Sequence, residues 1–440
     1  MRDRAATVDL PAPVAPPPGR LHETSWDRIR EMFPLDRGTA HLNSGTVGAM
    51  PHPVLDTYLT VTREWTGSLA NIYPPSLYPE YRAAIAADFG VDQDELVICH
   101  NATEGMSRVV SGLELGAGDE ALTTSHECFS VLSNLNLVHN RHGLTVTKLT
   151  LPSSYALRAE DIVDLFESAI TPRTKAVFFA AVTLFGGVRM PVRQLCQLAQ
   201  KHGLTTVVDG ALLPGMLHTD LRALGVDFLV GSGSKFQCGP LGTGLLYTRN
   251  RVDPRYNPLP LPMLWPVIST WYPLEGAPPP RSHPDTTASN NIGDYLQSAG
   301  SSSVGRAAAL ARACEIWNLI GRERIEEYIL DLGRYTRFQV AERFGPQALY
   351  SPTLDNRLVS PLTAFNPFRR GEDAWDGKKF DILVHRLEHE HRIWVRWVEF
   401  DVPGSARMHH AVRLCAHLFN NREEIDRALD VTARLADEIS

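Results

Sequence analysis

The sequence lacks the long hydrophobic run that a membrane helix needs, because no apolar stretch approaches the roughly 18 residues required to span a bilayer. The N-terminus, residues 1–22, is rich in proline and alanine and has no apolar signal-peptide core, so it is predicted to be a flexible tail. The net charge of −7 is spread along the chain without a basic block. We therefore expect a cytoplasmic protein that binds neither membranes nor nucleic acid.

Cysteine and lysine are both sparse. The six cysteines are scattered without a CxxC pair, which argues against a disulfide framework and against a zinc site, so no metal is expected. His385 and His389 are four residues apart, as metal ligands on a helix are, but a solvated helix face is the preferred interpretation. Only six of the 440 residues are lysine, and one of them, Lys235, lies in the glycine-rich segment GSGSKFQCGPLGTG.

Strand-like and helix-like patterns alternate from about residue 55 to residue 300. The predicted strands are continuous apolar stretches: ELVICH, EALTTSH, TVTKLTL, KAVFFAAVT, LTTVVDG and DFLVGS. This alternation predicts an α/β domain with a mostly parallel sheet and helices on both faces. Residues 301–440 read as helices followed by short strands and predict a smaller C-terminal α+β domain. Residues 23–54 are expected to pack on this smaller domain and on the active site.

Polar residues follow the predicted strands. His126, Thr183, Asp209 and Lys235 all fall at or just past a strand end. Ligands of such sheets bind at the carboxyl ends of the strands, so these side chains are candidates for one site. An aspartate and a lysine at neighbouring strand ends suggest pyridoxal 5'-phosphate. The lysine amine bonds to the aldehyde of this cofactor, and the carboxylate keeps its ring nitrogen protonated.

The segment NATEGMSR predicts a helix start that suits the phosphate of this cofactor. Asn101 and Glu104 have the spacing of a capping box. The free backbone N–H groups and the positive end of the helix dipole favour an anion there. Four residues are expected to contact the cofactor around its phosphate: Ala102, Thr103, Ser232 and Ser234.

Residues 207–247, VVDGALLPGMLHTDLRALGVDFLVGSGSKFQCGPLGTGLLY, resemble the core signature of the class V aminotransferases, a group of fold-type I pyridoxal-phosphate enzymes. The resemblance is to their isopenicillin N epimerase-like branch. It extends to HLNSGTVGAMP, NATEGMSRVV, TTSHECFS and AVRLCAHLFNNREEID, in the order in which the family carries these motifs. The resemblance implies the fold-type I fold, an amino-acid substrate, and a homodimer with its active site at the subunit interface.

The resemblance also implies roles for single residues. His126 is expected to stack on the cofactor ring, with a buried core histidine as the alternative. Arg413 is expected to grip the substrate carboxylate. Ser302 is expected to reach the phosphate across the dimer interface, with helix capping as the alternative. Asn43 and Ser44, in the segment HLNSGTVGAMP, are expected to contact the substrate. By residue type alone, Tyr73 is a further candidate to contact the substrate, with aromatic core packing as the alternative.

The sequence departs from the family at two positions. Leu212 stands where the family has histidine or glutamine near the phenolic oxygen of the cofactor, and Ser234 stands where it often has histidine. Thr183 is a candidate to supply the missing polar contact. The segment VRWVEFDVPGSARMHH corresponds to the loop on which cysteine desulfurases carry their nucleophilic cysteine, and it has none. Desulfuration through a persulfide is therefore not expected.

These features predict an enzyme in which Lys235 removes the proton from Cα of an amino acid. The preferred function is a C–S β-lyase for an S-conjugated cysteine in specialised metabolism such as antibiotic biosynthesis. The alternatives are a decarboxylating oxidative deaminase that yields an aldehyde, an amino-acid epimerase, an aminotransferase, and a binding protein without catalysis. A nicotinamide-dependent dehydrogenase is disfavoured, because no GxGxxG follows the first predicted strand.

Overall fold

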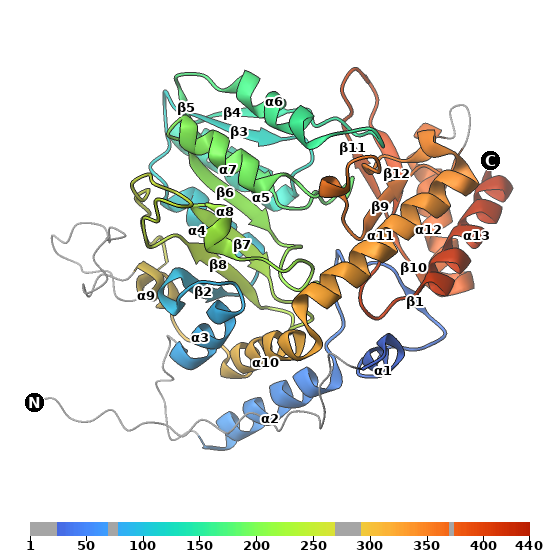
Figure 1. The fold of residues 1–440 in the computed structure, drawn as a ribbon, viewed down its shortest axis with the longest axis horizontal. Helices are drawn as coiled ribbons and strands as arrows, with labels where there is room; N and C mark the ends of the chain where they lie inside the picture. The colour runs from blue at the N-terminus through green and yellow to red at the C-terminus, as the bar shows by residue number, and fades with distance from the viewer. Residues whose placement is uncertain (1–23, 69–77, 269–291, 369–373) are drawn as a thin grey trace, which may run out of the picture.

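The structure, a computed structural model, describes residues 24–68, 78–268, 292–368 and 374–440 (Figure 1). The helices of these residues are α1 (Trp26–Arg30), α2 (His52–Ser68), α3 (Pro79–Ala87), α4 (Ala102–Gly112), α5 (Phe129–His142), α6 (Ala159–Ala169), α7 (Val192–Lys201), α8 (Leu221–Leu224), α9 (Ile292–Gln297), α10 (Val304–Ile320), α11 (Arg322–Phe344), α12 (Gly377–His391) and α13 (Arg422–Ile439). The strands are β1 (Ala40–His41), β2 (Leu96–Cys99), β3 (Glu120–Thr124), β4 (Thr145–Leu149), β5 (Thr174–Ala180), β6 (Thr205–Gly210), β7 (Phe228–Ser232), β8 (Gly244–Thr248), β9 (Leu362–Phe365), β10 (Ile393–Trp394), β11 (Arg396–Phe400) and β12 (His409–Cys415).

Seven strands form the large sheet in the order β2-β8-β7-β6-β5-β3-β4. Strands β3 to β7 pair in parallel, as the sequence predicts, whereas β8 runs antiparallel to both β7 and β2. The sequence pattern did not identify β8. Because β8 is antiparallel to both neighbours, β2 points the same way as β7. The carboxyl ends of β2, β3, β5, β6 and β7 therefore share one edge of the sheet.

Helices cover both faces of this sheet, and the alternation within its strands explains why. In β5, Val177 and Phe179 pack with residues of α6 and α7, whereas Ala176 and Phe178 pack with residues of α4 and α5 on the other face. The apolar side chains of both faces are thus removed from water, and each fully buried Val or Phe contributes on the order of 1.5–3 kcal/mol. Figure 1 shows the resulting three layers.

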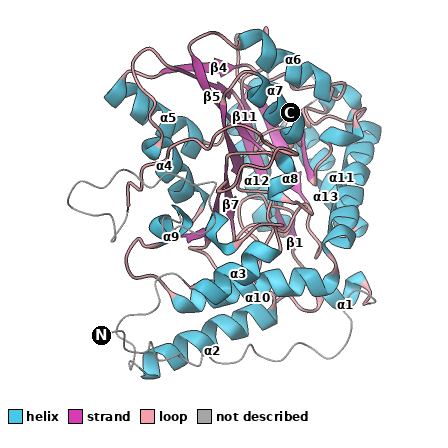
Figure 2. Cartoon of the chain, turned by 60° about the vertical axis from the view of Figure 1, so that its left-hand side comes forward, coloured by secondary structure: helices cyan, strands magenta, loops and turns pink. Residues whose placement is uncertain are grey.

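A smaller sheet near the C-terminus has the order β11-β12-β9 and is antiparallel throughout. Helices α11, α12 and α13 pack around this part of the chain, and in Figure 1 they lie beside the smaller sheet. The short strand β1 joins this region by pairing in parallel with β10. Helix α10 packs against α2 and α3 (Figure 2). The observed architecture confirms the predicted α/β fold with a smaller C-terminal sheet region.

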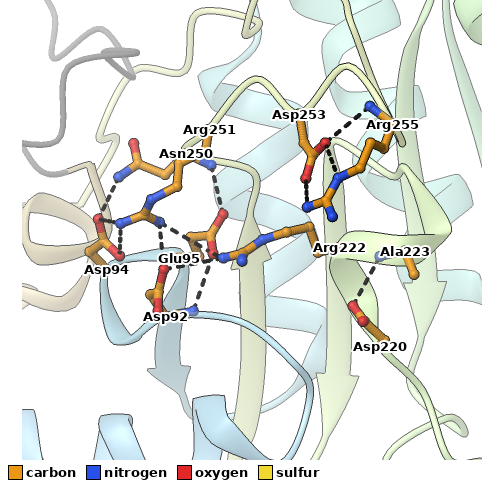
Figure 3. Close-up of polar contacts among 10 residues, drawn as sticks. All are labelled: Asp92, Asp94, Glu95, Asp220, Arg222, Ala223, Asn250, Arg251, Asp253 and Arg255. Atoms are coloured by element: carbon orange, nitrogen blue, oxygen red, sulfur yellow. Dashed lines mark hydrogen bonds and ion pairs between the residues drawn. The ribbon is translucent and has the colours of Figure 1, made fainter.

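An ion-pair network joins chain segments at the edge of the large sheet opposite the shared carboxyl ends, where β2 begins and β8 ends (Figure 3). Its centre is Glu95, which is fully buried. The Glu95 carboxylate accepts a hydrogen bond from Arg222 at 2.5 Å and lies 3.3 Å from an Nη of Arg251. Arg251 also pairs with Asp94 at 2.8 Å. A buried carboxylate is tolerated there because two arginines offset its charge.

None of the helices in the described ranges is long and apolar enough to cross a bilayer.

Candidate active site

The carboxyl edge of the large sheet brings Asp209 and Lys235 together. Asp209 lies at the end of β6 opposite Val230 of β7, and Lys235 follows three residues after β7 ends. Both side chains line a cavity of about 200 Å³. The other residues lining it are Asn101, Ala102, Thr103, Cys128, Ser130, Ala180, Val182, Leu184, Ala211, Leu212, Ser232 and Ser234. The cavity therefore contains several residues that the sequence singled out, from strand ends that are far apart in the chain.

Lys235 and Asp209, two ionisable groups of this cavity, shift each other's pKa. Burial lowers the pKa of Lys235, whereas the nearby Asp209 carboxylate raises it and the Arg413 cation lowers it. Burial raises the pKa of Asp209, while Lys235 and the backbone N–H of Ala211 lower it. The Ala211 N–H donates to one Asp209 oxygen at 2.9 Å, and no described residue bonds to the other oxygen. A carboxylate so buried, only 6% exposed, is ready to receive a further donor.

Helix α4 begins at the same cavity. The Asn101 side chain caps it by accepting the backbone N–H of Glu104 at 2.8 Å, as expected. The reciprocal half of the predicted capping box differs, because the Glu104 carboxylate accepts the N–H of His100 at 2.7 Å. The hydroxyls of Ser232 and Ser234 lie 3.4 Å apart beside this helix start. The first N–H groups of α4 and these hydroxyls form a set of donors that suits a phosphate.

Two glycines keep the backbone close around this site. At Gly244 a Cβ would lie 2.6 Å from the backbone of Asn101, so only glycine lets β8 approach the start of α4. At Gly48 a Cβ would lie 2.0 Å from the carbonyl oxygen of Lys235. The Gly48 N–H donates to the carbonyl of Ser234 at 2.9 Å. The N-terminal segment around Gly48 therefore packs directly against the backbone of Ser234 and Lys235.

Arg413 reaches the site from β12 of the smaller sheet. Its side chain is fully buried, and its guanidinium donates to the carbonyl of Leu184 at 3.0 Å and to the side chain of Asn43 at 2.9 Å. Burial lowers the pKa of Arg413 to about 10. Negative charge on the sulfur of Cys415 would raise this pKa. No carboxylate of the described residues pairs with Arg413, and its Nε has no partner there. A buried cation without a counter-ion is a receptor for an anion.

The residues beside Arg413 agree with that role. Asn43 joins β12 through a bridge to Cys415, and Gly45 donates its N–H to the Cys415 sulfur at 3.0 Å. The hydroxyl of Ser44 is buried and has no partner among the described residues. Asn43 thus contacts the predicted carboxylate receptor directly. Substrate contacts of Asn43 and Ser44 stay predictions.

His126 lies next to the cavity but is not among the residues that line it. Its ring packs edge-on against Phe185 and Phe400, and its Nε2 lies 3.2 Å from the carbonyl oxygen of Asp401. Burial lowers the pKa of His126 to about 4, so its imidazole is neutral at pH 7. The residue from the same turn that lines the cavity is Cys128. Stacking of His126 on the cofactor stays a prediction.

Thr183 and Ser302, like Arg413, Asn43 and Ser44, are not among the residues that line the cavity. The hydroxyl of Thr183 is buried and accepts the N–H of Val188 at 3.0 Å, which closes the loop between them. Ser302 is exposed just before α10, and its hydroxyl bonds to Tyr78 at 3.2 Å. Tyr73 falls outside the described residues. Cofactor contacts of Thr183 and Ser302 stay predictions.

The donor set fits pyridoxal phosphate. A buried carboxylate with one unpartnered oxygen suits the protonated ring nitrogen, the amine of Lys235 suits the aldehyde, and the start of α4 suits the phosphate. Sequence reasoning did not single out Cys128, Ser130 or Leu184 as site residues. The period-two alternation of a strand stops at its last residue and does not specify which residue of the following turn faces a ligand.

Comparisons with known proteins agree with this fit. The sequence profile described as "Aminotransferase class-V" matches residues 35–262, more than half of the chain. The chain belongs to the class V aminotransferase family. The chain is 28% identical to isopenicillin N epimerase of Streptomyces clavuligerus and 26% identical to that of Amycolatopsis lactamdurans. Each match covers 94% of this chain and 99% of the relative.

The fold of the chain also matches that of solved structures of another protein, C-DES. The chain superposes on two structures of C-DES with TM-scores of 0.73 and 0.69, at 22% identity in both. The first covers 93% of this chain and 99% of C-DES, and it contains glycine covalently linked to the PLP cofactor. The second covers 91% and 98%, and it describes C-DES as a cystine C–S lyase bound to cysteine persulfide.

Three residues of this chain, Lys235, Asp209 and Arg413, are suited to divide the chemistry of a class V enzyme among them. The protein uses pyridoxal phosphate, which supplies an electron sink for the pair released at Cα. Lys235 has a lowered pKa, so its amine loses its proton more readily and is suited to take up the Cα proton. Asp209, when ionised, would hold a proton at the ring nitrogen. Arg413 would bind and orient a substrate carboxylate, and this would decide which Cα bond faces Lys235.

Proposed function

We propose that this protein is a C–S β-lyase that acts on an S-conjugated cysteine-type amino acid. The observation that carries the proposal is the shared position of a base and a carboxylate receptor. Arg413 donates a hydrogen bond to the carbonyl of Leu184, which lines the same cavity as Lys235, so the two cations lie at one small volume. An amino acid held at Arg413 by its carboxylate presents Cα to the side of Lys235, and a sulfur on Cβ extends into the remaining space.

The supply of bases favours elimination over a two-base epimerisation. Lys235 is the one amine in the cavity lining that the described residues form. His126, two residues before the cavity-lining Cys128, bonds to the carbonyl of Asp401 and is a weak base because burial lowers its pKa to about 4. β-Elimination needs one base at Cα and an acid for the leaving group, which this site contains.

The relatives support the same class of substrate. C-DES is described as a cystine C–S lyase, and the two epimerases act, by their name, on isopenicillin N. The loop between β11 and β12, residues 401–408, contains no cysteine. A persulfide on that loop is therefore impossible, which favours release of the intact thiol.

Product analysis with S-conjugated cysteines tests the proposal. β-Elimination converts one substrate and one water into one thiol, one pyruvate and one ammonium, whereas decarboxylating oxidation releases carbon dioxide and an aldehyde and consumes oxygen. Epimerisation yields the D-amino acid. We expect thiol, pyruvate and ammonium in equal amounts from wild type and none from Lys235→Ala. Formation of any of the other products without pyruvate would refute the lyase and identify the alternative.

We also propose that the enzyme is a homodimer. The exposed position of Ser302 just before α10 is compatible with a contact to the phosphate site of a second subunit. Light scattering of the purified protein should give twice the 48.8 kDa mass of one chain. A monomer with full activity would refute both the dimer and the role of Ser302.

A further inference from the structure

Cys128 is the one cysteine of this chain that is not buried. The other five are buried: Cys99, Cys196, Cys238, Cys314 and Cys415. Cys128 precedes α5, where its carbonyl accepts the N–H groups of Val131 and Leu132 at 2.9 and 3.3 Å. Its thiol makes no capping bond and has no hydrogen-bond partner among the described residues. The backbone is thus fixed by the helix start while the thiol is left free.

The free thiol belongs to the lining of the cofactor cavity. Cys128 lines that cavity together with Lys235 and with Asp209, whose second oxygen is unpartnered although the side chain is more than nine-tenths buried. A charge on Cys128 acts on Lys235 directly, since it raises the pKa of the lysine amine. Thiol and amine therefore face the same ligand from two different strand ends, β3 and β7.

We propose that Cys128 is a further catalytic residue, the acid that gives its proton to the departing sulfur of the substrate. The inference rests on the proposed lyase function. Of the cavity-lining side chains, Lys235 and Asp209 already have roles at Cα and at the cofactor ring, and Cys128 is the remaining one that can give a proton to sulfur, because serine and threonine hydroxyls are much weaker acids. Lys235 is engaged with the proton from Cα when the C–S bond breaks.

The proton balance of the step closes within the site. Lys235 takes the proton from Cα, and the electron pair of that bond moves toward Cβ as the Cβ–S bond breaks. The sulfur leaves with the electron pair of the Cβ–S bond and takes the proton of the Cys128 thiol. The protonated Lys235 then returns a proton to the Cys128 thiolate. No oxidant or reductant is consumed, and the site regains its starting protonation.

The leaving group decides the test. Breaking a C–S bond to an alkyl thiol needs a proton on sulfur, whereas β-chloroalanine loses chloride without one. We compare wild type with Cys128→Ala on β-chloroalanine and on whichever of S-methyl-, S-ethyl- and S-benzyl-L-cysteine wild type cleaves fastest. Loss of a general acid should slow pyruvate formation from the thioether about a hundredfold or more. The rate with β-chloroalanine should stay within about twofold of wild type, since no proton is needed there.

Two controls separate catalysis from packing. Ser133→Ala removes an exposed hydroxyl from the same helix, outside the cavity lining, and should leave both rates unchanged. Cys128→Ser keeps the size of the side chain but is a poor acid, so it should resemble Cys128→Ala. Equal losses on the two substrates in either Cys128 variant would mean a structural role and would overturn the inference.

A measurement without turnover tests the position of the thiol. Iodoacetamide should alkylate Cys128 in protein stripped of cofactor, and added pyridoxal phosphate should protect it, as mass spectrometry of the peptides would report. The five buried cysteines should stay unlabelled in both samples. Labelling of Cys128 that the cofactor does not slow would overturn the inference. If wild type forms no pyruvate from either substrate, the proposed lyase function fails and the proton-donor role fails with it.

Discussion

Glu127 is a buried carboxyl group that no cation of the described residues neutralises. It follows His126 after β3, is 1% exposed, and accepts the hydroxyl of Thr124 at 2.6 Å. Its second oxygen is buried without a partner among the described residues. Burial, reinforced by the charge of Asp209, raises the pKa of Glu127 from an ordinary 4.5 to about 8, against the Thr124 hydrogen bond. We predict that Glu127→Gln makes the protein more stable than wild type at neutral and alkaline pH.

The sign follows from proton binding. Between pH 4.5 and about 8 the folded protein holds a proton on Glu127 that the unfolded chain has lost. The free energy of unfolding therefore falls as pH rises through this window, by about 1.4 kcal/mol per pH unit. Over the whole window the loss reaches about 5 kcal/mol, and it stays constant above pH 8. Glutamine keeps the acceptor for Thr124 and does not titrate, so the variant escapes this loss.

Urea unfolding of wild type and Glu127→Gln at a series of pH values measures the effect. The difference between their free energies of unfolding should be small near pH 5, grow by about 1.4 kcal/mol per pH unit, and level off near pH 8. Other titrating groups such as His417, whose pKa burial lowers to about 3, are common to both proteins and cancel in the difference. A difference that does not change with pH would refute the argument that Glu127 is protonated in the folded protein.

Three other changes test the site and its scaffold. Arg413→Lys keeps a cation but loses the two-pronged guanidinium, so the KM for amino acids should rise at least about tenfold in steady-state assays. Gly48→Ala places a Cβ against the carbonyl of the active-site lysine and should weaken retention of the cofactor on dialysis at least about tenfold. Glu95→Gln removes the buried carboxylate that the partly exposed Arg222 and Arg251 share (Figure 3) and should lower the free energy of unfolding by about 1.5–3 kcal/mol in urea.

Two of these changes, Gly48→Ala and Glu95→Gln, have a counterpart that should have little effect. Gly67→Ala adds a Cβ that meets no atom within 4 Å, so cofactor retention should equal that of wild type. Asp253→Asn disrupts the solvent-facing pair with Arg255 near the same network and should change stability little. An unchanged KM in Arg413→Lys would remove the carboxylate role, and equal effects of Gly48→Ala and Gly67→Ala would refute the close approach at the lysine.

The sequence predicted the large sheet because buried parallel strands are apolar on both faces. Stretches such as the one ending at Asp209 stand out for that reason, and their strand ends located both Asp209 and Lys235. Strand β8 was missed because GLLYT directly follows a glycine-rich loop, and its antiparallel direction depends on how that loop returns the chain. Strand β9 was missed because it has only four residues and its partner strand β12 is distant in sequence.

The details of the cavity depend on the third dimension. His126 and Cys128 are two residues apart in one turn, and both are ordinary candidates by residue type. The structure turns the imidazole toward Phe185, Phe400 and Asp401, and it leaves the thiol in the cavity lining. These neighbours come from later elements of the chain. A one-dimensional pattern contains no information on such contacts.

The segment that contains Asn43 and Gly48 contacts both Arg413 and the loop that contains Lys235. It is hydrogen-bonded to Arg413 at Asn43 and to the loop of Lys235 at Gly48, although it precedes both by more than 180 residues. Chimeras that exchange only the C-terminal region between relatives would pair a foreign β12 with a native N-terminal segment. Transplanting substrate preference therefore requires that residues 40–48 travel together with residues 393–415 as one unit.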